Sequence, residues 1–270
     1  MSYHDSAYRL SQGQHRLEHA YGDRVTFLHN PFALSLMQRI GHSDCVQPEL
    51  GDLVRAAYQY LCAETLSLHL RSSPQRVPTR MQALTPAGVY AGDCFEAQPI
   101  VSVAIARAGI VPSEVCFRMG AALLGVESIR QDHFAMARQT NASGEVVGVS
   151  VSGEKIGGDV DDATVLLPDP MGATGGSIDH AIRFYKRSVK GRARRFVAIF
   201  LTCTPECVKR LIEAHDDVHI VALRLDRGLS PDAVLAAKPG VLAGETGLTS
   251  TQYIVPGAGG VGEVLNNSFV

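Results

Sequence analysis

The sequence lacks the features that mark a membrane protein or a nucleic-acid-binding protein. No apolar run approaches the roughly 20 residues needed to span a bilayer, which argues against a transmembrane role. The formal net charge at pH 7 is only -2, so the charge does not favour nucleic acid as the main partner. An anionic ligand would therefore have to be held by a local site.

The chain also has little of what a secreted or metal-binding protein uses. Its six cysteines are scattered without a Cys-x-x-Cys pair, and no charged segment followed by an apolar one opens the chain. We therefore expect a reduced, cytoplasmic setting. Cys203 and Cys207 are four positions apart, but no third and fourth ligands accompany them. Both are interpreted as small buried residues rather than a metal site.

The composition that is present, 46% hydrophobic and 19% charged, is that of an ordinary soluble globular protein. A length of 270 residues suits one α/β domain with appendages or two small domains, and one domain is the preferred interpretation. Residues 1–23 are polar and are interpreted as a weakly ordered N-terminal appendage, which leaves 24–270 as the domain. The apolar patterns predict strands at 100–105, 126–129, 165–167, 196–201 and 218–223, and helices at 48–70, 175–188 and 205–214. This alternation predicts a parallel sheet flanked by helices.

Two segments depart from the alternation. Residues 71–98 contain several prolines and few apolar runs, and are interpreted as irregular or edge strands that lead into the core sheet. Residues 131–160 hold two alternating apolar stretches separated by residues 141–144, which predicts a β-hairpin flap.

One loop carries the strongest chemical signal. The apolar run 165–167 is ended by Pro168 and Pro170, because proline cannot donate to a sheet, so Asp169 is placed at a strand end. Residues 174–177 then open a helix whose N–H groups and dipole form an anion site. Amides that hold a phosphate, beside a carboxylate that accepts from ribose hydroxyls, suit a sugar phosphate. The alternative is an ordinary turn between a strand and a helix.

The segment Asp169-Pro-Met-Gly-Ala-Thr-Gly-Gly-Ser177 closely resembles the phosphoribosyl pyrophosphate (PRPP) signature of uracil phosphoribosyltransferases, Asp-Pro-Met-Leu-Ala-Thr-Gly-Gly-Ser. Only Gly172 departs from that wording. The resemblance implies a type I phosphoribosyltransferase fold, with a hairpin flap and a small hood built from the N-terminal helices and the C-terminal segment. The PRPP ligands that it implies in this loop are Asp169, Met171, Ala173, Thr174, Gly175, Gly176 and Ser177.

Two arginines are similarly implicated in binding the diphosphate of PRPP. Arg107-Ala108-Gly109 looks like the family's Leu-Arg-Ala-Gly-Leu-Gly loop, and Arg130 falls where the family has the arginine of a Tyr-Arg-Asn-Glu-Glu segment. A guanidinium suits this role because its fixed fork of donors matches phosphate oxygens and keeps its charge. Taken singly, each arginine is more often a surface residue.

Near its C-terminus the sequence resembles the family's base-recognition segment. Tyr253-Ile-Val-Pro-Gly-Ala-Gly-Gly-Val-Gly262 is similar to Tyr-Ile-Ile-Pro-Gly-Leu-Gly-Asp-Ala-Gly, which implies base contacts from Tyr253, Ile254, Gly259 and Val261. Gly260 replaces an acid that in the family helps to organise PRPP and its metal, while Glu263 stands where the family has another acid. The glycines also satisfy GxGxxG, but only eight residues follow, too few for a dinucleotide fold.

A further, weaker similarity to the family lies between the PRPP loop and the C-terminal segment. Asp226-Arg-Gly-Leu229 resembles the family's Asp-Gln-Gly-Leu, and an insertion of about 20 residues follows it before the pattern resumes.

The resemblance implies Mg²⁺-assisted transfer of ribose-5-phosphate from PRPP to uracil, giving UMP and pyrophosphate in pyrimidine salvage. Asp169 and Arg107 would carry the catalysis, and the metal would arrive with PRPP rather than on protein ligands. A homodimer or tetramer is expected. The alternatives are a nucleotide- or PRPP-binding regulator that lost turnover with the acid at position 260, and a phosphoribosyltransferase that acts on a different base.

Overall fold

A mostly parallel sheet forms the centre of the computed structural model, which describes residues 15–140 and 146–268, with the backbone alone at 137–140 and 146–150. Every neighbouring pair in its main path is parallel except the last, β5 with β6. In spatial order the strands are β1 (Val25–Phe27), β10 (Val218–Leu225), β9 (Arg195–Cys203), β7 (Thr164–Pro168), β4 (Ile100–Ala106), β5 (Ile129–Thr140) and β6 (Val146–Lys155). The short β8 (Met171–Gly172) pairs with the end of β9.

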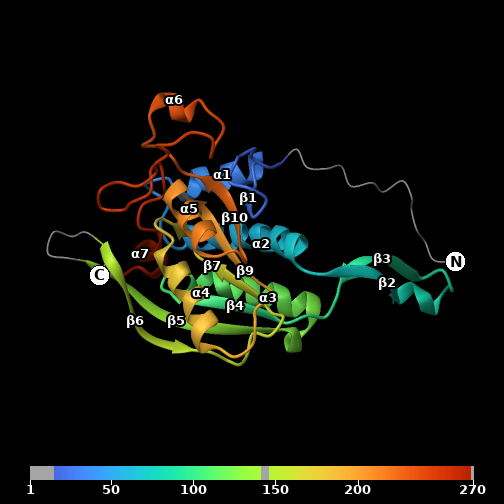
Figure 1. Ribbon diagram of the computed structural model, residues 1–270. Helices are drawn as coiled ribbons and strands as arrows, with labels where there is room; N and C mark the ends of the chain where they lie inside the picture. Colours follow the sequence, from blue (N-terminus) through green and yellow to red (C-terminus); the bar gives the residue numbers. More distant parts are fainter. Residues whose placement is uncertain (1–14, 141–145, 269–270) are drawn as a thin grey trace.

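Helices cover both faces of this sheet (Figure 1). Side chains alternate between the two faces along each strand, as in β9, where Val197 packs toward one helical layer and Phe196 toward the other. Burial on both faces explains the continuous apolar runs of the sequence. One layer holds α1 (Pro31–Ile40), α2 (Glu49–His69), α3 (Ile110–Leu124) and α7 (Val261–Asn266), and the other holds α4 (Gly176–Ser188) and α5 (Pro205–Ala214).

The predicted α/β architecture is therefore confirmed, and two local assignments were wrong. The segment 71–98 forms β2 (Ser72–Pro78) and β3 (Val89–Phe95), which pair only with each other and project from the body (Figure 1). Residues 126–128 form a short 3-10 helix, and the strand begins at Ile129. Gly125, with φ +86°, ends α3 just before this turn, so the chain needs three further residues to re-enter the sheet.

The predicted hairpin flap is present as β5 and β6, antiparallel to each other, and residues 141–144 of its turn lie outside the described residues.

The described part of the N-terminal appendage, residues 15–23, contains no helix and is called the strap below. Its residues Leu17 and Ala20 donate backbone hydrogen bonds to Phe27 and Pro239. The strap therefore contacts the inserted segment near residue 240, which contains α6 (Asp232–Leu235).

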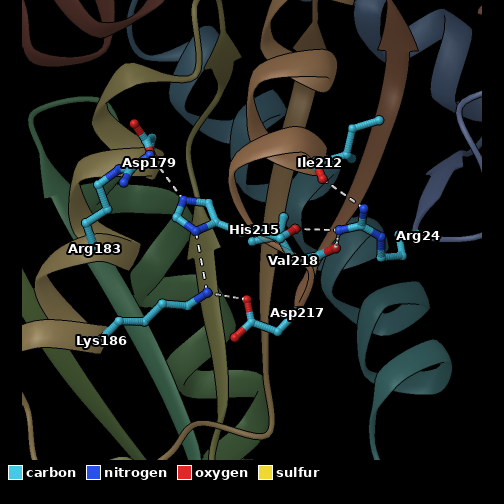
Figure 2. Close-up of polar contacts among 8 residues, drawn as sticks. All are labelled: Arg24, Asp179, Arg183, Lys186, Ile212, His215, Asp217 and Val218. Carbon is cyan, nitrogen blue, oxygen red and sulfur yellow. Dashed lines mark hydrogen bonds and ion pairs between the residues drawn. The ribbon is translucent and has the colours of Figure 1, made fainter.

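Parallel pairing gives the sheet two chemically different edges. The carboxyl edge is defined here by the last residues of β4, β7, β9 and β10 and the loops after them; the amino edge is defined by their first residues. At the amino edge, Arg24 donates to the carbonyls of Ile212, His215 and Val218, and His215 contacts Asp179 at 2.8 Å (Figure 2). These contacts tie the end of α5 to the strands beside it.

In the described ranges, no helix combines the length and the apolar character that crossing a membrane requires.

Candidate functional site

Three loops meet at the carboxyl edge, and a glycine allows two of them to touch. The β4–α3 loop (residues 107–109) follows β4, the β7–α4 loop (169–177) follows β7, and residues 226–229 follow β10. A Cβ placed on Gly109 would lie 3.0 Å from the Pro168 carbonyl oxygen and 2.8 Å from that of Ile105. The absence of a side chain therefore brings the first two loops into contact.

The β7–α4 loop is held by backbone and side-chain hydrogen bonds to its neighbours. The Asp169 carboxylate accepts from the Met171 amide at 3.1 Å, which fixes the turn after the strand. Thr204 on the β9–α5 turn donates to the Ala173 carbonyl at 2.6 Å, and Arg210 donates to the Thr174 carbonyl at 3.1 Å. The loop is thus attached at Ala173 and Thr174 to the start and the side of α5.

The departure at Gly172 has a steric reason. A Cβ at this position would lie 2.7 Å from the Cβ of Cys203 and 3.1 Å from the Sγ of Cys207, both closer than packing permits. Both cysteines are buried and unpaired by a disulfide, as predicted, and burial raises the pKa of each thiol. They occupy the volume that a larger side chain at position 172 would need.

The start of α4 forms the predicted amide cradle. Gly175 is the N-cap residue with φ +72°, a left-handed conformation that glycine adopts without a steric cost. The amides of the first turn, from Gly176 and Ser177 onward, have no carbonyl four residues earlier in the helix to bond. Gly176 donates a long hydrogen bond, 3.3 Å, to the Thr174 hydroxyl. An anion at this point would meet several N–H groups and the positive end of the helix dipole.

Arg107 lies at the same edge, where the C-terminal segment packs on it. The peptide bond between Ala106 and Arg107 is cis, and the Arg107 guanidinium donates to the Ser268 hydroxyl at 2.7 Å and to its carbonyl at 3.0 Å. A Cβ on Gly262 would lie 3.2 Å from the Cβ of Ala108. The first turn of α7 therefore rests against the β4–α3 loop.

Arg130 is not brought to this edge. Its strand partner is Val101, five residues before Ala106, which is roughly 16 Å of strand from the carboxyl edge. Its guanidinium contacts Asp132 at 3.0 Å and also donates to the carbonyls of Gly158 and Asp159. The structure thus places the Arg130 side chain in a polar network at the amino edge.

The register carries the backbone of a different arginine, Arg138, past the carboxyl end of β4. Ala135 on β5 pairs with Ala106, and the backbone of Arg138 follows three residues later, beyond the carboxyl end of β4. The sequence offered a signal for this assignment. An arginine that follows a buried strand by several residues lies nearer to the carboxyl edge than one at its start.

The C-terminal loop (residues 253–262) is held in place by a buried acid, Asp226. The sequence identified this residue only through the weak similarity at 226–229. Asp226 is 1% exposed, accepts from the Gly257 amide at 2.9 Å and is paired with Arg224. Arg224 in turn donates to the Gly257 carbonyl at 2.8 Å. Both backbone groups of one glycine are therefore held from the end of β10.

The four predicted base contacts differ in exposure. Tyr253 is 50% exposed, while Ile254 and Val261 are buried beside it along the chain. Gly259, with φ +64°, has open space at its Cβ position. This combination leaves backbone groups near Gly259 accessible to a planar ligand while apolar side chains anchor the loop.

The acidic residues of the site suit a metal that is delivered by a ligand. Among the described residues, no cluster of three or more His, Cys, Asp or Glu side chains could hold a metal ion. Mg²⁺ in proteins commonly uses one or two carboxylates together with substrate phosphates and water. Asp169, half-buried at the carboxyl edge, fits that limited role.

Comparison with known proteins agrees with this geometry. A family model described as uracil phosphoribosyltransferase matches residues 27–242. A uracil phosphoribosyltransferase of Dictyoglomus turgidum is 29% identical over 210 residues, covering 77% of this chain and 86% of the relative. One from Lactococcus lactis subsp. cremoris is 38% identical over 112 residues, 41% of this chain and 43% of the relative.

The fold comparison extends over more of the chain. The solved structure of the AQ2163 protein from Aquifex aeolicus superposes with a TM-score of 0.66 at 20% identity, covering 89% of this chain and 97% of that one. At this identity the similarity concerns the fold alone. The C-terminal loop lies beyond the range of the family match, which ends at residue 242.

Proposed function

The chain belongs to the uracil phosphoribosyltransferase family, and on this premise we propose that it transfers ribose-5-phosphate from PRPP to uracil. The observation that carries the proposal is the meeting of the β4–α3 and β7–α4 loops at the carboxyl edge, which sets Arg107 and Asp169 around an amide cradle. In an open α/β sheet, ligands bind outside the carboxyl ends of the strands.

In the proposed reaction the bond between the anomeric carbon and the diphosphate oxygen breaks, and a bond to N1 of uracil forms as N1 loses its proton. The leaving group is pyrophosphate and the product is UMP. A sugar cation and a diphosphate separate in the transition state, so the protein acts mainly by positioning and charge stabilisation. The flap formed by β5 and β6 would restrict water near the sugar cation.

Each group at the edge has a role suited to its chemistry. The amides of residues 174–177 would hold the 5′-phosphate, with Met171 and Ala173 shaping the loop around it, and Asp169 would accept from the ribose hydroxyls. Arg107, in a loop with Ala108 and Gly109, would bind the diphosphate. Arg130 is left out of this assignment, because its guanidinium contacts Asp132 at the amino edge.

Base recognition would fall to the C-terminal loop. Backbone groups of Ile254, Gly259 and Val261 would hydrogen-bond to the edge of uracil, and Tyr253 would lie beside the base. Mg²⁺ bound to PRPP would neutralise part of the diphosphate charge when it is present. On the protein side, Asp169 is the carboxylate that we place nearest to it.

Oligomerisation is part of the proposal. The hairpin β2–β3 projects from the body and exposes Val77, Tyr90 and, at its tip, Met81 and Leu84, the last at 78%. An isolated two-stranded hairpin is marginally stable in water, so this arm would gain stability by packing on a second copy of the chain. Sedimentation of the intact protein distinguishes a dimer or tetramer from a monomer.

The decisive experiment incubates the protein with PRPP, Mg²⁺ and a panel of pyrimidine and purine bases, and follows nucleotide formation by chromatography. UMP formed from uracil supports the proposal. Product from another base overturns the choice of uracil. No product with any base, together with calorimetric binding of UMP or PRPP, supports instead a regulator without turnover, which the glycine at position 260 favours.

A further inference from the structure

A carboxylate occupies the place where a side chain at Gly260 would begin. Gly260 is the N-cap residue of α7, and a Cβ built on it would lie 1.8 Å from Oε2 of Glu263 and 2.8 Å from its Cδ. The Glu263 side chain is therefore folded back over Gly260. The carboxyl carbon of an aspartate at position 260 would lie about 1.5 Å beyond that Cβ. The two alternative carboxylates would thus be only a few ångströms apart.

Glu263 also lies on the element that packs against the β4–α3 loop. Gly262, its neighbour, approaches Ala108, and Ser268, just after the helix, accepts from Arg107. The Glu263 side chain is half-buried. The acid is therefore held beside the loop that we assign to the diphosphate, not on a remote surface of the molecule.

Within the part of the chain that the structure describes, the Glu263 carboxylate makes no hydrogen bond or ion pair. A glutamate at the third position of a helix often caps it by accepting from the N-cap amide, here that of Gly260. That bond is not formed among the described residues. A half-buried carboxylate that neither caps its helix nor meets a cation is suited to a cationic or hydrogen-bond-donating ligand.

We propose that Glu263 supplies, from the next turn of the chain, the negative charge that the family places at position 260. It faces the diphosphate end of PRPP and accepts hydrogen bonds from water molecules of the Mg²⁺ that accompanies it. With Glu263 folded back in this way, a side chain at position 260 would overlap its carboxylate, and glycine avoids that overlap. The inference rests on the proposed function, because it assigns a role toward the same substrate.

The test measures PRPP binding by calorimetry, with and without Mg²⁺, for the wild type and for E263Q. Glutamine preserves the shape of the side chain and can still cap a helix, so only the charge is removed. With Mg²⁺ we expect E263Q to bind PRPP roughly 10–100-fold more weakly. In EDTA we expect it to bind at least as tightly as the wild type, because a repulsive charge is gone. Glu213 is exposed on α5, and E213Q is the matched control that changes neither affinity.

A charge swap completes the test. The double variant G260D/E263A returns the acid to position 260 and removes the side chain that would overlap it, and we expect it to recover most of the lost affinity in Mg²⁺. If the wild type binds PRPP and E263Q binds it equally well in Mg²⁺, the role of Glu263 is overturned while the proposed function stands. Failure of the swap to recover affinity also overturns it. If the wild type itself does not bind PRPP, the proposed function fails and this inference with it.

Discussion

The two edges of the sheet use the same kinds of side chain in opposite ways. At the amino edge, charges neutralise one another: Lys186 contacts Asp217 at 2.6 Å, and Arg130 contacts the fully buried Asp132 (Figure 2 shows the first pair). At the carboxyl edge, Arg107 and Asp169 lie among glycine-rich turns and the amides of a helix start. The amino edge therefore joins charged side chains to one another, whereas the carboxyl edge combines charged side chains with a glycine-rich loop and a helix start.

Sequence context alone does not show at which edge an arginine lies. The edge nevertheless predicts whether its substitution changes the stability of the fold or the affinity for substrate. We expect substitutions at the amino edge to change stability without changing substrate affinity. Substitutions at the carboxyl edge should lower substrate affinity, and those of charged side chains there should change stability little. Four measurements test that separation.

The largest effect is expected for Arg130→Ala. The variant leaves the carboxylate of Asp132 buried without its cation, although Tyr185 and the Gly157 amide still donate to it at 2.7 and 2.8 Å. We expect a loss of about 3–5 kcal/mol in the free energy of unfolding, measured in urea, with unchanged PRPP affinity. Arg187→Ala, at an exposed position of α4, is the matched control. Weaker PRPP binding with normal stability would return Arg130 to the ligand site.

Arg107→Ala should show the opposite pattern. Removing a guanidinium that would contact a diphosphate weakens PRPP binding by about 1.5–3 kcal/mol, roughly 10–100-fold, as calorimetry can measure. Stability should change little, because Arg107 is only half-buried and the Ser268 groups to which it donates lie near the chain end. Arg118→Ala, on the exposed side of α3, provides the comparison. Unaltered PRPP affinity in Arg107→Ala contradicts the assignment.

Gly175→Ala tests the amide cradle through the backbone. A side chain at φ +72° costs about 1–2 kcal/mol of stability, and its Cβ would press on Cys207 at 3.2 Å. Because the strain displaces the first amides of α4, UMP affinity should fall as well. Gly125→Ala has a similar φ of +86° but open space around its Cβ. With ψ 153° the backbone of Gly125 lies in a region that is almost confined to glycine, so Gly125→Ala should lose at least as much stability and keep its UMP affinity. An equal loss of affinity in both variants would show that the cradle is not the phosphate site.

The smallest effect concerns pH and the amino edge. Burial, and then the neighbouring His219, lower the pKa of His69 from 6.5 to about 3, while Arg195 donates to its ring at 3.2 Å. The folded state thus binds this proton less tightly than the unfolded state does. The contribution of His69 is complete above pH 6.5 and is lost as the pH falls toward 3.

Between pH 7 and 5 this change should cost about 1 kcal/mol, after allowance for the partial exposure of the ring. Urea unfolding at the two pH values measures it, and His69→Gln should lose that part of the pH dependence. His42→Gln, at an exposed position, is the control. An equal pH dependence in His69→Gln and the wild type would show that His69 does not carry the effect.

Much of the fold was predictable because its signals are local. Buried parallel strands appear as continuous apolar runs, and a threonine or proline marks the start of a helix such as α5, which the structure places at residues 205–214 as predicted. The hairpin β2–β3 was missed as a separate sheet because strand partners cannot be identified from one segment alone. Its prolines suit strands that pair on one side only.

The candidate site divides in the same way. The β7–α4 loop could be recognised because its groups are contiguous in the chain, and a strand end followed by a helix start determines how they face a phosphate. The reason for a glycine at position 172 could not be recognised from the sequence. It depends on Cys203 and Cys207, which approach from another strand and another helix. Nor could the buried Asp226 that holds Gly257 be identified as a support, because that contact spans a separation of 31 residues.

By itself, the sequence determined the family, since nine consecutive residues match its PRPP signature and combine an acid, glycines and a helix start. Tertiary structure alone decided at which edge Arg130 lies and which acid lies beside Gly260. Strand register sends Arg130 to one edge and the backbone of Arg138 to the other, and a side chain folded back by one helical turn brings Glu263 over Gly260. Both outcomes depend on distances between groups that are separated along the chain, which local propensity does not encode.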